Sequence, residues 1–105
     1  MTDAYKWVHP LPNEREREIL TILIEEAAEV QQRATKLLRF GRDEVQPGQD
    51  LTNAQRLSRE LGDMAVMVEM AIVAGLVLPS EINGQQAEKR RKLRTFMQTI
   101  NQPAT

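Results

Sequence analysis

Residues 23–30, Leu-Ile-Glu-Glu-Ala-Ala-Glu-Val, set three carboxylates into an otherwise apolar helical run, and two of them stand three positions apart. The same spacing returns in residues 60–63, Glu-Leu-Gly-Asp, directly before a second apolar run. At about 100° per residue, acids three positions apart share one face of a helix, one turn from each other. Crowded carboxylates beside a core face repel one another and resist desolvation, whereas a bound cation reverses that penalty. The two motifs therefore predict helices that carry a site as well as a core face.

The composition restricts the fold and excludes several kinds of site. The chain of 105 residues has the length of one domain, and its 41% hydrophobic and 28% charged residues are typical of folded rather than disordered proteins. Aromatic residues make up only 4%, so the core must be aliphatic, which favours an all-α fold. The chain has no cysteine and one histidine, His9. Disulfides, zinc–thiolate sites and cysteine nucleophiles are therefore excluded.

The charge and the hydropathy argue against two classes of partner. The net charge of −1 gives no global field that would draw the chain to nucleic acid or to a membrane surface. The longest apolar stretch, residues 64–78, contains Glu69 and is too short to span a bilayer. No signal peptide is recognisable at the start of the sequence. We therefore expect a cytoplasmic protein without nucleic-acid or membrane partners.

Residues 14–40 are predicted to form the first helix, because Asn13 suits an N-cap and Gly41 suits a helix end. Residues 1–13 are expected to form an extended arm, in which Trp7 either packs on protein or stacks on a ligand base. The helix carries an apolar seam of Leu20, Leu23, Ala27, Val30, Ala34 and Leu37. A second stripe, about 110° round from the seam, consists of Glu26, Glu29, Arg33 and Lys36.

A second helix is predicted from Thr52 or Asn53 to Ala74, after a loop at residues 41–52 that is either a lid or a surface connection. Its seam consists of Leu57, Leu61, Met64, Val68 and Ala71, and its flanking stripe of Asn53, Arg56, Glu60, Asp63 and Met67. The offset between seam and stripe matches that of the first helix, so packing of the seams brings the acids together. From Met64 onward the helix is apolar nearly all round. We therefore expect a helical bundle that is completed by a homodimer or homotetramer.

A third helix is predicted to begin at Pro79 and to continue through Phe96 and Met97. Residues 89–94, Lys-Arg-Arg-Lys-Leu-Arg, make it basic, which indicates either a solvated face or contacts with phosphate. Residues 14–100 thus form one helical domain, and residues 101–105 are expected to be a frayed tail.

The predicted site holds four carboxylates, Glu26, Glu29, Glu60 and Asp63, and no histidine or cysteine. Oxygen ligands of this kind favour Mg²⁺, with Mn²⁺ as a substitute, over zinc or copper. A di-iron site of the ferritin type is excluded, because it needs Glu-x-x-His pairs and the chain has none. Cations held in this way typically bind phosphate oxygens and activate a water.

Four side chains on the same stripes can supply hydrogen-bond donors to a polyphosphate: Arg33, Lys36, Asn53 and Arg56. The alternative interpretation is a solvated acidic face, in which Arg33 and Arg56 are salt-bridge partners of the acids. Spacing alone leaves both interpretations open.

The two acidic motifs together resemble the E-E-x-x-E … E-x-x-D signature of the MazG-like, all-α nucleoside triphosphate pyrophosphohydrolases. The resemblance extends to residues 36–41, to Asn53 ahead of Leu57, and to Lys89, Lys92, Leu93, Phe96 and Met97, so it covers roughly residues 14–97. The chain is most like the short, single-domain, phage-type members. The gap between its two acidic motifs is on the long side for that family.

The resemblance implies hydrolysis of a nucleoside or deoxynucleoside triphosphate between the α- and β-phosphates, which gives a monophosphate and pyrophosphate. It implies that Glu26, Glu29, Glu60 and Asp63 bind the metal, with Glu25 as a supporting or water-orienting acid. Lys36, Lys89 and Lys92 would hold phosphates. The family's members are dimers or tetramers, which agrees with the argument from the second helix.

The motif does not determine which substrate is cleaved or whether the protein is an enzyme. Relatives in the family include dCTP- and dUTP-cleaving enzymes and phosphoribosyl-ATP pyrophosphohydrolase, so the motif does not fix the base. Two non-enzymatic alternatives also stay open: a helical dimerisation module with solvated acids, and a nucleotide-binding regulator that keeps the metal without turnover.

Overall fold

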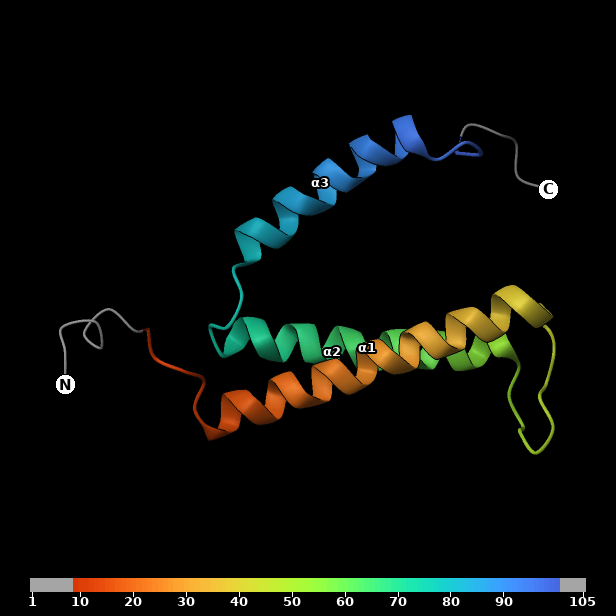
Figure 1. The fold of residues 1–105 in the computed structure, drawn as a ribbon, viewed down its shortest axis with the longest axis horizontal. Coiled ribbons are helices and arrows are strands. Elements are labelled where there is room, and N and C mark those ends of the chain that lie inside the picture. Colours follow the sequence, from red (N-terminus) through yellow and green to blue (C-terminus); the bar gives the residue numbers. More distant parts are fainter. Residues whose placement is uncertain (1–8, 101–105) are drawn as a thin grey trace.

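The computed structural model describes residues 9–100, and within them the chain forms three α-helices and no strand (Figure 1). The helices are α1 (Glu14–Phe40), α2 (Asn53–Val73) and α3 (Pro79–Phe96), which confirms the all-α class and the three predicted helices. Residues 1–8 and 101–105, which include Trp7, most of the predicted arm and the predicted tail, lie outside the described residues. No described helix is long and apolar enough to cross a membrane.

The first two helices begin with reciprocal caps. The Asn13 side chain accepts a hydrogen bond from the Glu16 N–H, and the Glu16 side chain accepts one from the Asn13 N–H, both at 2.9 Å. Thr52 and Gln55 repeat this arrangement at the start of α2, at 3.1 and 2.9 Å. Each capping box satisfies two backbone donors that would otherwise lack partners. α3 has no side-chain cap and begins with Pro79.

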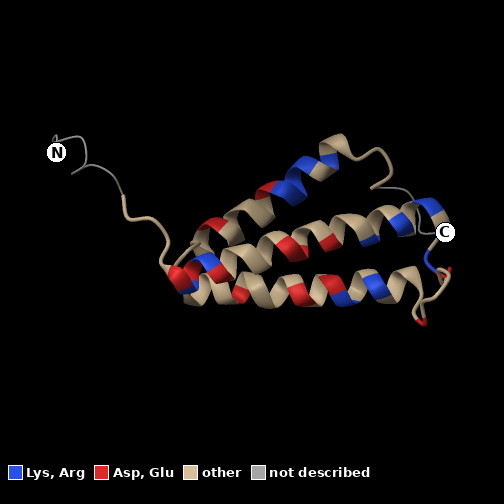
Figure 2. Ribbon diagram, turned by 60° about the horizontal axis from the view of Figure 1, so that its bottom comes forward, with Lys and Arg blue, Asp and Glu red and all other residues tan. Residues whose placement is uncertain are grey.

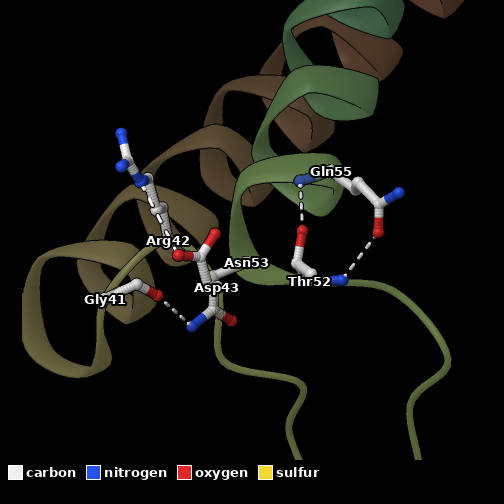
Figure 3. A network of polar contacts seen from close by, with 6 residues as sticks. All are labelled: Gly41, Arg42, Asp43, Thr52, Asn53 and Gln55. Atoms are coloured by element: carbon white, nitrogen blue, oxygen red, sulfur yellow. Dashed lines mark hydrogen bonds and ion pairs between the residues drawn. The ribbon is translucent and has the colours of Figure 1, made fainter.

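The connection from α1 to α2, residues 41–52, is tied to the start of α2 (Figure 3). Asn53 is 2% exposed, and its Nδ2 donates to the Gly41 carbonyl at 2.8 Å and to Glu44 Oε1 at 3.2 Å. Its backbone N–H donates to the Glu44 carbonyl at 2.9 Å, and the Ala54 N–H donates to the Arg42 carbonyl at 3.0 Å. These bonds hold residues 41–44 against the helix, so this half of the loop is a fixed connection.

α1 and α2 lie antiparallel and pack against each other along their length (Figure 1). Their core lies near the end of the hairpin where α1 begins and α2 ends, around the buried side chains of Ile19, Met67 and Ala71. Partly buried apolar side chains surround these three: Ile22, Leu23, Ala74, Leu76 and Val77. At Gly75 (φ 74°) the helix ends in a Schellman turn, in which the Leu76 N–H donates to the Ala71 carbonyl at 2.9 Å.

The contact face of α1 is rotated from the predicted seam, and in this detail the seam prediction was wrong. Ala27 and Ala34 were expected in the seam and are exposed, whereas Glu26 and Arg33 of the flanking stripe are half-buried. On α2, Leu61 of the predicted seam is 50% exposed. The α1–α2 contact therefore covers only part of each seam. We call the uncovered part, Ala27, Ala34 and Leu61, together with the exposed Leu38 one turn after Ala34, the apolar side of the hairpin.

α3 leaves the end of α2 and diverges from the hairpin (Figure 1). No residue of α3 is buried, and Phe96 is 76% exposed. On α2, Val66 and Val73 are 51% and 88% exposed. A single chain thus buries one face of the apolar second half of α2, at Met67 and Ala71, and leaves other apolar side chains of that half exposed.

Candidate metal centre

The two acidic motifs meet beside the contact between α1 and α2. Glu26 from α1 and Glu60 and Asp63 from α2 each bring a carboxylate oxygen to within 4.8 Å of the other two. We call these three residues the acid cluster. Glu26 and Glu60 are half-buried, whereas Asp63 is exposed. In Figure 2 the acids colour the middle of the hairpin red, and basic residues follow toward the loop end. The convergence inferred from helical spacing is therefore present for three acids.

The electrostatics of the acid cluster are those of crowded like charges. A side-chain hydrogen bond with Glu60 raises the pKa of Glu26, and desolvation and the charges of Glu60, Asp63 and Glu29 raise it further. Two ionised carboxylates have no proton to donate, and Glu60 Oε2 is then enclosed without a hydrogen-bond partner. Without a cation or a shared proton, this oxygen carries the free-energy penalty of desolvation without a compensating interaction.

The remaining acids of the first motif lie differently. The Glu29 carboxylate lies 3.9 Å from Arg33 Nη2, one turn along α1, and does not belong to the acid cluster. Glu25 is exposed and also lies outside the cluster. Between described residues, no ion pair includes Glu26, Glu60 or Asp63. The salt-bridge interpretation thus describes Glu29 but does not account for the acid cluster.

The predicted phosphate donors divide into three groups. Arg33, Lys36 and Arg56 are half-buried on the hairpin, between the acid cluster and the loop. Asn53 is buried at the loop, where its amide nitrogen already donates two hydrogen bonds. Lys89 and Lys92 lie on α3, which the chain does not pack against the acid cluster. Of these predicted donors, Arg33 and Arg56 stand nearest the acids, although Arg33 also faces Glu29, and Lys36 Nζ lies farther along α1, 5.6 Å from the centre of the Phe40 ring.

The donor set of the acid cluster fits a hard divalent cation. All three groups are carboxylates from rigid helices, and one of their oxygens is enclosed without a partner. Mg²⁺ commonly binds through a few carboxylates and completes its shell with water and phosphate oxygens. The acid cluster leaves room for such a shell because Asp63 is exposed.

Sequence reasoning gave no role to an apolar pocket beside the acid cluster. Ile19, Ile22, Met67 and Met70 line it, and Arg15 and Glu18 stand at its rim. One sequence feature could have indicated this pocket. Met67 ends the acidic stripe of α2, four residues after Asp63 and on the same face of the helix.

Comparison with family models, curated proteins and solved structures found no match to this chain.

Proposed function

We propose that this protein is a Mg²⁺-dependent hydrolase that cleaves a nucleoside or deoxynucleoside triphosphate between its α- and β-phosphates. The products are the nucleoside monophosphate and pyrophosphate, and Mn²⁺ can replace Mg²⁺. The choice of this bond rests on the resemblance of the two acidic motifs to the MazG-like pyrophosphohydrolases, and the metal requirement rests on the acid cluster.

The observation that carries the proposal is Glu60 Oε2, which is enclosed beside two further carboxylates and has no hydrogen-bond donor when all three acids are ionised. A merely solvated acidic face would let each carboxylate keep its water or its arginine. Here three acids from two helices converge instead, at a net energetic penalty that a divalent cation removes.

Glu26, Glu60 and Asp63 hold the cation in this proposal. A cation held there supplies charge neutralisation at the phosphate oxygens and a water of lowered pKa. In the reaction, the oxygen of a water bonds to the α-phosphorus, and the bond to the α–β bridging oxygen breaks. The electron pair of that bond leaves with pyrophosphate, and the proton of the water passes to a carboxylate or to solvent.

The chain's other residues bind and orient the substrate. Arg33, Lys36 and Arg56 offset the charge of the polyphosphate, which a cluster of acids alone would repel. Glu25, exposed one residue before Glu26, is our candidate for orienting the attacking water.

We further propose that the working form is a homodimer or homotetramer. The apolar side of the hairpin and the faces of α3 are exposed in one chain, with Leu38 at 85% and Phe96 at 76%. Apolar patches of this kind mark protein interfaces. The same assembly would allow Lys89 and Lys92 of another copy to approach the phosphates.

The test is a panel of nucleoside and deoxynucleoside triphosphates, with phosphoribosyl-ATP included, incubated with Mg²⁺ and analysed by chromatography. We expect a monophosphate and pyrophosphate in equal amounts, and no reaction with a chelator present. Accumulation of a nucleoside diphosphate and orthophosphate would contradict the assigned bond. Stabilisation by Mg²⁺ and nucleotide without any turnover would favour the regulator over the enzyme.

A further inference from the structure

The surroundings of the acid cluster differ at its two ends along the hairpin. Toward the loop end lie Arg33 and Arg56, and the Arg33 side chain is only 13% exposed. Arg56 precedes Glu60 by four residues and Arg33 follows Glu26 by seven. These separations correspond to about 6 and 10 Å along the helix axes. Because α1 and α2 run antiparallel, both arginines lie on the same side of the cluster, at distances that a phosphate chain spans.

The opposite end is apolar. A pocket of about 100 Å³ lies between the helices, lined by Ile19, Ile22, Met67 and Met70. Ile22 precedes Glu26 by four residues and Met67 follows Asp63 by four, so the pocket begins about 6 Å from the acid cluster. The pocket shares Arg15, Ile19 and Met70 with a larger groove of about 330 Å³.

The geometry points to a fixed direction of substrate binding: the nucleoside occupies the pocket at Ile22, Met67 and Met70 together with the larger groove that adjoins it, and the departing pyrophosphate lies toward Arg33 and Arg56. This inference rests on the proposed function and adds to it a nucleoside subsite and a pyrophosphate subsite. The α-phosphate, joined to both parts, then lies over the acid cluster.

The reverse direction is disfavoured by charge. Pyrophosphate carries several negative charges, and at the pocket end it would meet two acids, Glu18 and Glu69, against one base, Arg15, together with apolar walls. A nucleobase is an uncharged, flat group whose faces suit the flexible, polarisable side chains of Met67 and Met70. Arg15 and Glu18 can supply a donor and an acceptor to the polar edge of the base.

This direction is compatible with the proposed assembly. Both subsites lie on the side of the hairpin that carries the acid cluster. Leu38 and Leu61 belong to the apolar side. Leu61 stands about 100° round α2 from Glu60, and Leu38 stands about 120° round α1 from Glu26. A second copy that covers Leu38 and Leu61 therefore leaves the acid cluster open, and the exposed Val73 of the groove lies outside that covered side.

Binding of the two products to the same variants tests the direction without measuring turnover. Calorimetry with Mg²⁺ present would titrate a nucleoside monophosphate and pyrophosphate separately into Met70→Gln and Arg56→Gln. We expect Met70→Gln to weaken the monophosphate about fivefold and pyrophosphate less than about twofold, because it removes an apolar wall. We expect Arg56→Gln to weaken pyrophosphate about tenfold and the monophosphate far less, because it removes a charged donor.

Matched controls lie on the same helix, outside both subsites. Val66→Gln repeats the apolar-to-amide change at an exposed position, and Arg59→Gln repeats the loss of charge at another. Neither should change either affinity by more than about twofold. If Met70→Gln does not fold, Glu18→Gln at the exposed rim should alter the ratio of affinities among different monophosphates and leave pyrophosphate unchanged.

The outcomes separate this inference from the proposed function. A wild-type protein that releases monophosphate and pyrophosphate, with variants that weaken both products equally or in the reversed pattern, overturns the direction alone. A wild-type protein that cleaves no nucleotide overturns the proposed function and the two subsites with it. The expected crossed pattern supports both.

Discussion

The hairpin of α1 and α2 and the third helix, α3, are helices of the same chain with different sources of stability. α1 and α2 each begin with a capping box, pack against each other and enclose the buried residues. α3 has no side-chain cap and no buried residue, and it exposes Phe96 as well as a bidentate Glu88–Arg91 pair at 2.6 and 3.0 Å. In proteins most of the stability of a helix comes from tertiary packing, which α3 lacks within one chain. The difference teaches that the chain consists of a hairpin with its own core, which carries the acid cluster, and a helix that this core does not stabilise.

The largest expected effect is on turnover, and it should differ between an acid of the hairpin and an acid of α3. Glu60→Gln removes one of the three carboxylates that we propose to bind the metal, so turnover should fall about 1,000-fold. Glu81→Gln removes an exposed acid from the first turn of α3 and should leave turnover within about twofold. Initial rates with Mg²⁺ and the preferred nucleotide check both. Equal rates in the two variants would contradict the assignment of the acid cluster as the active site.

The next effect concerns what covers α3. If Phe96 packs against another copy, Phe96→Ala loses about 3 kcal/mol of association, which weakens the dimer about 100-fold. Thr95→Ala, the exposed neighbour, is the control and should leave association unchanged. Sedimentation across a concentration series measures both. A stable wild-type monomer at micromolar concentration would show that α3 persists uncovered.

A smaller effect tests the caps that distinguish the hairpin. Thr52→Ala removes the side-chain oxygen that accepts from the Gln55 N–H at 3.1 Å. The free energy of unfolding should fall by about 1 kcal/mol. Thr99→Ala, beyond the end of α3 and exposed, should change it by less than about 0.5 kcal/mol. Urea titration followed by circular dichroism measures the difference, and equal losses in both variants would argue against the capping box.

The smallest effect follows from the raised pKa of Glu26. Folding favours the protonated form of this acid, so its contribution to stability is present at low pH. That contribution is lost as pH rises from the ordinary value of 4.5 through the raised pKa. Glu26→Gln should therefore melt at a higher temperature than the wild type at pH 8 without metal, and the gap should close below about pH 4.5. A gap that is independent of pH would mean that Glu26 is not crowded.

The sequence predicted the helices far better than their packing. Asn13, Gly41 and Pro79 mark element ends through local backbone chemistry, and the structure agrees at each. The rotation of α1 was missed, because periodicity gives one broad apolar stripe without saying which part a partner helix covers. The sequence therefore placed Ala27 and Ala34 in the seam, although both are exposed.

The candidate site was also predicted only in part. Spacing placed Glu26, Glu60 and Asp63 on converging faces, and all three meet. It could not tell that the Glu29 carboxylate lies toward Arg33 instead, since one turn of helix offers both directions. It also could not find the buried role of Asn53, because the loop that its side chain binds has no periodic signal.

The most direct test of the central claim, that the acid cluster holds a catalytic cation, is a pair of measurements on Asp63→Asn. Turnover with Mg²⁺ and the melting temperature of the metal-free protein are measured on the wild type, on Asp63→Asn and on Asp50→Asn, an exposed aspartate of the loop. We predict that Asp63→Asn loses at least about 100-fold in turnover while its metal-free melting temperature stays level or rises, because repulsion within the cluster is relieved. Asp50→Asn should match the wild type in both. Unchanged turnover in Asp63→Asn would contradict the assignment of the acid cluster as a metal site.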